Sequence, residues 1–246
     1  MMRFVQWFWP PPPPNDTVIT PTKPANPFGW LLIPLGLAVA YVVVPLAGGL
    51  ALGLTTLRLM WFVSLGWMLW TALLRLAHPS WGSWARALGL TCDLAPKPFL
   101  RATCGLILAQ SLTLGVLALG QRLLLPSQPP PTQLWEQLNQ LPVWEVYLMV
   151  AVATPLQEEL AFRGWLYHLG SRLLASPVGG GIVSVAVFTL LHSQYRNHAY
   201  ALLFVLSLGI LLTVWRHRYG TLWPGVVAHA FNNSLAFVAY KLATSS

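Results

Sequence analysis

Charged residues are scarce in this chain of 246 amino acids. Aspartate, glutamate, lysine and arginine make up 8% of the sequence and hydrophobic residues 56%, whereas charged residues are about a quarter of a typical soluble domain. The mean hydropathy is +0.60. A surface with so few charges cannot face water throughout, which excludes an ordinary soluble enzyme and a disordered chain.

Cysteines and acidic residues are also few. The two cysteines, Cys92 and Cys104, are too few for a disulfide framework or a cysteine-rich metal site, and we expect two unpaired thiols. The chain has 14 basic and 6 acidic residues, a formal net charge of +8. Basic residues stand singly at the ends of apolar runs, as Arg58, Arg75 and Arg122 do, which favours membrane topology over nucleic-acid binding as the reason for the positive charge.

Long apolar runs take the place of charges. A membrane-spanning helix needs about 20 apolar residues, so we predict an all-α polytopic transmembrane bundle of about seven spanning helices, within a range of about six to eight. The runs cover approximately residues 28–57, 59–76, 102–125, 143–174, 182–195, 199–215 and 222–240. The glycines Gly179 to Gly181 precede the fifth run, and we interpret them as a hinge.

Proline-rich and polar segments divide the chain into three parts. Residues 1–27 contain a proline run and predict a disordered N-terminal tail. Residues 28–142 hold the first spanning helices and end in a polar, proline-rich loop at 126–142. Residues 143–246 form a helical core in which ionisable groups interrupt the apolar runs.

The basic residues predict an orientation in the membrane. The segment 77–101, expected to be an interfacial loop or short amphipathic helix, falls on the same side as Arg172 and the Arg216-His217-Arg218 cluster when the helices alternate. Lysine and arginine accumulate on the cytoplasmic side, so we expect a cytoplasmic N-terminus. We expect the protein in a bacterial plasma membrane or a thylakoid membrane.

Two of the six acidic residues, Glu158 and Glu159, are adjacent inside an apolar run. An ionised side chain deep in a bilayer costs about 2.5–3.5 kcal/mol on insertion scales, so such groups face the bundle interior and are partnered. Arg163 lies four residues after Glu159 on the same helix face and is its expected partner. Glu158 is rotated by about 100° and is available for chemistry. A cluster that only ties helices together is the alternative.

Histidine and asparagine side chains occur in two later runs. Phe188 and His192 are four residues apart in one, and His229 and Asn233 are four apart in the other. A single histidine within a membrane is often a packing residue, but two of them with an asparagine and a free glutamate supply what peptide hydrolysis needs. A carboxylate can take a proton from water and return it to the leaving amine, imidazoles can orient the water, and an amide can stabilise the oxyanion.

The three motifs together resemble those of a known family. Glu158-Glu159-x-x-x-Arg163, Phe188-x-x-x-His192 and His229-x-x-x-Asn233, in this order on separate apolar runs, are similar to the motifs of the CPBP family (CAAX proteases, bacteriocin-processing and Abi proteins). The resemblance covers residues 143–240 approximately. It implies an intramembrane endopeptidase whose catalytic helical core is the segment 143–246.

The resemblance also implies a role for each residue. Glu158 would activate the attacking water, with His192 and His229 positioning it. Asn233 would donate a hydrogen bond to the oxyanion. The implied substrate is a membrane-embedded or membrane-proximal peptide, with a prenylated C-terminus as one option, and no cofactor is implied. Supporting positions are Glu159, Arg163 and Phe188.

Several alternatives stay open. Two histidines and a carboxylate also form a catalytic zinc ligand set, so a metalloprotease is the alternative to a glutamate mechanism. The same helices could belong to a non-catalytic immunity or scaffold protein, or to a transporter with a Glu/His relay. His168 is a candidate for outer support of the site. Expected partners are membrane lipid and a peptide or protein substrate, not nucleic acid; the sequence indicates no oligomeric state.

Overall fold

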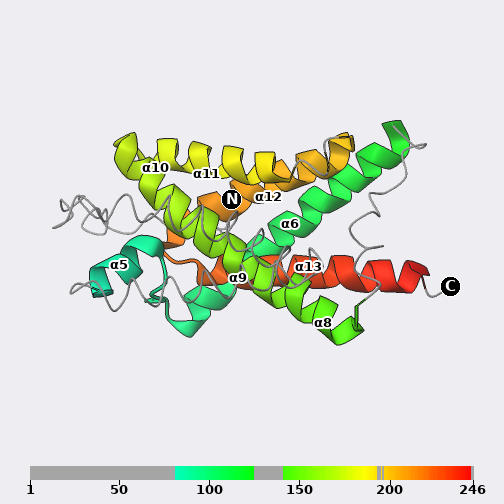
Figure 1. The fold of residues 1–246 in the computed structure, drawn as a ribbon, viewed down its shortest axis with the longest axis horizontal. Coiled ribbons are helices and arrows are strands. Elements are labelled where there is room, and N and C mark those ends of the chain that lie inside the picture. The colour runs from blue at the N-terminus through cyan, green and yellow to red at the C-terminus, as the bar shows by residue number, and fades with distance from the viewer. Residues whose placement is uncertain (1–80, 125–140, 193–194, 196, 245–246) are drawn as a thin grey trace, which may run out of the picture. The chain divides into compact units, whose positions relative to one another are not determined.

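The computed structural model describes residues 81–124, 141–192, 195 and 197–244 (Figure 1). The regular secondary structure within these residues is helical, in agreement with the predicted all-α class. The predicted tail 1–27, the first two predicted spans and most of the loop 126–142 lie outside them. The division of the chain at residue 142 stays a prediction.

Six helical stretches make up the described part. The longest uninterrupted one, which we call the glutamate helix, runs from Val143 to Leu173 and changes its winding along the way. Its segments are α8 (Val143–Tyr147), η3 (Leu148–Ala153), α9 (Thr154–Glu158), η4 (Glu159–Leu166) and α10 (Tyr167–Leu173), where η denotes π-helix. The other helices are α5 (Trp81–Leu88), α6 (Pro96–Leu124), α11 (Pro177–Leu191), α12 (Ala199–Tyr219) and α13 (Trp223–Thr244).

Several helix boundaries differ from the predictions. α6 begins at Pro96 rather than near residue 102, so the end of the predicted interfacial segment 77–101 is helical. Proline suits the first helical position because the missing N–H has no partner there in any case. The glycines 179–181 are not a hinge, since they lie within α11. That helix begins at Pro177, where the Ser176 side chain accepts a hydrogen bond from the Gly179 N–H at 3.1 Å.

Two of the described helices, α6 and α12, are long and apolar enough to cross a membrane, and α11 is apolar but shorter. The predicted number of seven spans is therefore not confirmed. α6 exposes leucine and valine side chains along most of its length, including Leu112, Val116 and Leu123. A contiguous apolar surface of this kind is typical of contact with lipid or another protein.

The helices pack in a continuous chain of neighbours (Figure 1). α11 folds back along α10 and η4 and lies against α12 on its other side. α6 packs against both α12 and α13, and α13 in turn contacts η3 and α9. The glutamate helix is thus contacted by α11 and by α13, the helices that carry the predicted histidine motifs.

The basic groups that the sequence places on one side of the membrane lie at one end of these helices. The Tyr167 hydroxyl and His217 Nδ1 are hydrogen-bonded at 2.8 Å, which joins α10 to the end of α12. Arg216 Nη2 donates to the Ala87 carbonyl at 2.8 Å, which joins α12 to α5. Arg172 is in the last turn of α10. The cytoplasmic orientation of this end stays a prediction.

The crossing of α10 and α11 depends on glycine. A Cβ on Gly180 would collide with the backbone of Tyr167 and Ser171, and a Cβ on Gly170 would lie 3.0 Å from Gly180 Cα. Small residues at such crossings let two backbones approach closely, as they do in membrane-protein bundles. The close approach fixes where α11 lies on the glutamate helix.

We expect Gly180→Ala to lower the free energy of unfolding by about 1–3 kcal/mol, because the methyl group must displace backbone atoms. The matched control is Gly115→Ala on α6, where a Cβ meets nothing within 4 Å. Denaturant unfolding in detergent, followed by circular dichroism, measures both. Equal stability of the two variants would show that the close crossing is not a constraint on the fold.

Candidate active site

The predicted site lies where the glutamate helix is locally widened. Glu158 is the last residue of α9 and Glu159 the first of η4, and the π-helical η3 precedes α9. A π-helix bonds residue i to i+5, so each such stretch shifts the backbone hydrogen bonds and the faces on which side chains emerge, and π-turns are frequent at functional sites. The two glutamates therefore stand at a junction of two helix types.

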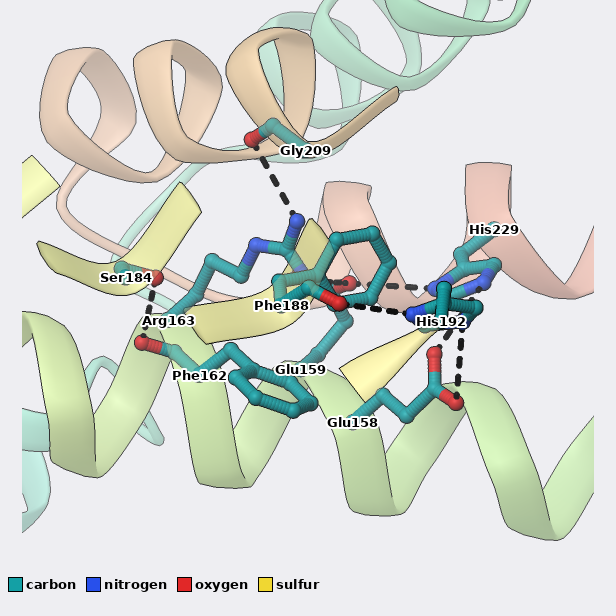
Figure 2. Close-up of polar contacts among 9 residues, drawn as sticks. All are labelled: Glu158, Glu159, Phe162, Arg163, Ser184, Phe188, His192, Gly209 and His229. Atoms are coloured by element: carbon teal, nitrogen blue, oxygen red, sulfur yellow. Dashed lines mark hydrogen bonds and ion pairs between the residues drawn. The ribbon is translucent and has the colours of Figure 1, made fainter. Parts of the chain in front are cut away.

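Glu159 and Arg163 form a fully enclosed ion pair. Arg163 Nη1 lies 3.3 Å from Glu159 Oε1, and the side chains are 0% and 1% exposed. Arg163 also donates from Nη2 to the Gly209 carbonyl of α12 at 3.3 Å. Its guanidinium lies 4.2 Å from the centre of the Phe188 ring, a cation–π contact (Figure 2). The predicted support positions are thus in contact with one another, and they connect three helices.

Glu159 is also in contact with α13. His229 Nδ1 lies 3.1 Å from Glu159 Oε1, the same oxygen that Arg163 approaches. A Cβ on Gly225, one turn before His229, would lie 3.2 Å from Glu159 Oε2. Both carboxylate oxygens of Glu159 are therefore engaged or tightly packed, and this side chain has no room to act on a substrate.

Glu158 faces the two predicted histidines instead (Figure 2). Its Oε2 lies 3.7 Å from His229 Nε2, and its Oε1 lies 4.0 Å from His192 Nε2. The Glu158 side chain is 18% exposed, as is that of His192. These separations exceed a direct hydrogen bond and are of the kind that a shared water molecule bridges.

The second nitrogen of each imidazole fixes the tautomer. His192 Nδ1 lies 2.7 Å from the Phe188 carbonyl oxygen, which can only accept, so Nδ1 carries the proton. His229 Nδ1 lies against the Glu159 carboxylate, another acceptor, and carries a proton for the same reason. Nε2 of each imidazole faces Glu158.

Asn233 is hydrogen-bonded to the backbone of the glutamate helix. Its Nδ2 donates to the Val150 carbonyl of η3 at 2.9 Å. That bond takes one of the two N–H groups of the amide. His168, the candidate for outer support, lies near Arg172 and Arg216 at the basic end rather than beside Glu158.

The fit of a metal ion was the open alternative. Within the part of the chain that the structure describes, no group of three or more His, Cys, Asp or Glu side chains is arranged so that it could hold one. A zinc mechanism at Glu158, His192 and His229 stays the alternative prediction.

Three residues close to these side chains were not predicted from the sequence. They are Ser184, which donates to the Phe162 carbonyl at 2.8 Å, Gly209 and Gly225. A signal for two of them exists in the sequence, because Ser184 precedes Phe188 by four residues and Gly225 precedes His229 by four. Each therefore lies on the same helix face as a motif residue.

The comparison with known proteins bears on this constellation directly. Residues 140–235 match the family described as type II CAAX prenyl endopeptidase, Rce1-like. The resemblance to the CAAX proteases is confirmed. The matched segment contains the glutamate helix and both histidine motifs and leaves out α5 and α6.

Two curated relatives match a similar length of chain. UPF0177 protein YbdI of Lactococcus lactis subsp. lactis is 28% identical over 98 residues, which is 40% of this chain and 50% of that protein. The "Uncharacterized 24.3 kDa protein" of Escherichia coli is 32% identical over 116 residues, 47% of this chain and 53% of that protein. The chain thus spans about half the length of these relatives. No solved structure matches it.

Removing one member of the buried ion pair should be costly. We expect Arg163→Met to lower the free energy of unfolding by about 3–5 kcal/mol, because Glu159 would keep a buried charge without its partner. Arg122→Met, at an exposed position of α6, should change it by less than about 0.5 kcal/mol. Thermal unfolding in detergent compares the two. Adding Glu159→Gln to Arg163→Met should recover part of the loss, and strictly additive losses would contradict the pair.

Proposed function

We propose that the chain is a membrane-embedded peptidase of the CAAX-protease type in which Glu158 activates the water that attacks a peptide bond. The observation that carries the proposal is the placement of one accessible carboxylate between two imidazoles of fixed tautomer. The match of residues 140–235 to the Rce1-like family supports the same class of enzyme.

Glu158 and Glu159 have different surroundings and therefore different proposed roles. Glu159 is 1% exposed and bound by Arg163 and His229, so it serves as a fixed charge that orients its neighbours. Glu158 is more exposed and is approached only at longer range by Nε2 of His192 and of His229. The carboxylate that can reach a water molecule is therefore Glu158.

The reaction would proceed by general base and then general acid catalysis. A water molecule held between Glu158 and the two imidazoles gives a proton to Glu158 as its oxygen bonds to the carbonyl carbon of the substrate. Glu158 returns this proton to the nitrogen of the leaving amine as the C–N bond breaks. Such proton transfers contribute typically about 10²–10⁴-fold to the rate. The histidines hold the water in line and prevent its tumbling.

Asn233 can contribute to the oxyanion through its remaining N–H. The bond to the Val150 carbonyl fixes the plane of the amide, so the second N–H has a defined direction. A donor that is held in place before the reaction costs no reorganisation when charge develops on the substrate oxygen. This is the role we propose for Asn233.

The substrate we propose is a peptide presented from the membrane. α6 and α12 are long and apolar enough to cross a bilayer, and α6 exposes apolar side chains along its length. An apolar or prenylated C-terminal segment would partition into the same layer and reach the site laterally. Its cleavage would then release a short soluble peptide.

Replacement of the proposed base is the direct test. In purified protein reconstituted in lipid, Glu158→Gln should lower cleavage of a fluorogenic farnesylated CAAX peptide by about 10²–10⁴-fold, because the amide cannot accept the proton of water. The matched control is Glu145→Gln on α8, which should cleave as the wild type does. A Glu158→Gln variant with wild-type turnover would refute the proposal and favour a scaffold role for the cluster.

Chelation tests the choice between a glutamate mechanism and a zinc mechanism. Cleavage of the same peptide should persist after prolonged incubation with 1,10-phenanthroline or EDTA, since the proposed steps need only side chains and water. A loss of activity that added zinc restores would establish the metalloprotease alternative.

A further inference from the structure

A row of residues at four-residue spacing faces the glutamate helix from α11. Gly180, Ser184 and Phe188 are buried on this face, and His192 follows directly after the last residue of the helix. Ser184 is 0% exposed, although the rest of α11 is almost wholly apolar. A buried hydroxyl in such surroundings needs a hydrogen-bond partner.

The partner of Ser184 belongs to the glutamate helix. Its Oγ donates to the Phe162 carbonyl of η4 at 2.8 Å, across 22 residues of sequence (Figure 2). Serine in a helix commonly returns its hydroxyl to a carbonyl of its own helix, as Ser171 does by donating to the Tyr167 carbonyl at 2.7 Å. Ser184 instead uses its hydroxyl to join two helices.

This bond belongs to a series of contacts that sets the register between the two antiparallel helices. At one end Gly180 lies against Tyr167 and Ser171. Further along, the Phe188 ring packs edge-on against the Phe162 ring, with centres 5.1 Å apart and planes at 81°. The next position on this face is His192.

His192 meets the opposite helix at Glu158, with 4.0 Å between Nε2 and Oε1. The position of His192 along the glutamate helix is therefore determined by the contacts that α11 makes before this residue. Ring contacts tolerate sliding, because dispersion attraction has no preferred direction. A hydrogen bond to a carbonyl oxygen weakens steeply when the geometry is lost.

We propose that Ser184 is a positioning residue that locks α11 in register on η4 and thereby holds His192 opposite Glu158. A slip of α11 by one residue would displace His192 by about 1.5 Å along the helix. Misplacement of about 1 Å can cost about 10²-fold in rate. The catalytic consequence rests on the proposed function, whereas the structural claim about His192 and Glu158 does not.

The test measures the placement of His192 opposite Glu158 and the turnover of the peptide substrate in separate experiments. Protein with isotope-labelled histidine is observed by NMR in detergent, with the His192 signal assigned through His192→Gln. In the wild type, Glu158→Gln should shift this signal. In a Ser184→Ala background the same change should shift it by less than half as much. Thr113→Val, which removes a hydroxyl that donates to the Ala109 carbonyl of its own helix α6, is the matched control and should respond as the wild type does.

Turnover of the farnesylated peptide is the second readout. Ser184→Ala should lower kcat about tenfold with KM within about twofold of the wild type. Ser184→Cys, with a similar shape and a weaker donor, should give an intermediate kcat and keeps the test valid if Ser184→Ala folds poorly.

The two readouts separate failure of this inference from failure of the proposed function. An undiminished NMR response to Glu158→Gln in both the Ser184→Ala and the Ser184→Cys backgrounds would overturn the positioning role, whatever the activity. A diminished response in a protein that does not cleave the peptide would support the positioning role and count against the proposed function alone.

Discussion

The enclosed charge of Arg163 is the constraint on which the rest of the arrangement depends. An unpaired guanidinium in an apolar interior is costly, so the surrounding helices must supply compensation. That compensation comes from three directions: the Glu159 carboxylate of its own helix, the Gly209 carbonyl of α12 and the Phe188 ring of α11. The contacts of this one side chain thus connect three helices.

The buried charge of Arg163 also affects a fourth helix, α13, through Glu159. His229 shares with Arg163 the oxygen Oε1 of Glu159, so the imidazole of α13 is oriented by a carboxylate that Arg163 holds in place. Removing this charge would loosen His229 as well as Glu159. Glu158 differs from Glu159 by one residue, and that single step around the helix moves it out of the charge network towards both Nε2 atoms. The chemical difference between two identical side chains is therefore entirely environmental.

Contacts within one helix could be predicted from the spacing of residues in the sequence, whereas contacts between helices could not. The pair of Glu159 and Arg163 follows from an i, i+4 relation within one helix, which the sequence shows directly. The helical core was visible from its apolar runs, although the start of α6 at Pro96 was missed because charged and proline residues there suggested an interfacial loop or a short amphipathic helix. The supposed hinge at Gly179 to Gly181 was wrong, since glycine serves close packing at that point and not flexibility. Contacts between helices, such as that of Ser184 with Phe162, depend on register that no local pattern states.

Interhelical hydrogen bonds end on the π-helical stretches of the glutamate helix. Two side chains from neighbouring helices donate to carbonyls in these stretches, Asn233 to Val150 in η3 and Ser184 to Phe162 in η4. Within an α-helix each carbonyl accepts from a fixed position four residues on, whereas a π-stretch moves this partner and opens the helix locally. A donor from α13 on one stretch and from α11 on the other anchors the glutamate helix on both sides of α9. The short segment between them ends at Glu158, so the proposed base is held from both directions, by α13, which carries His229, and by α11, which is followed directly by His192.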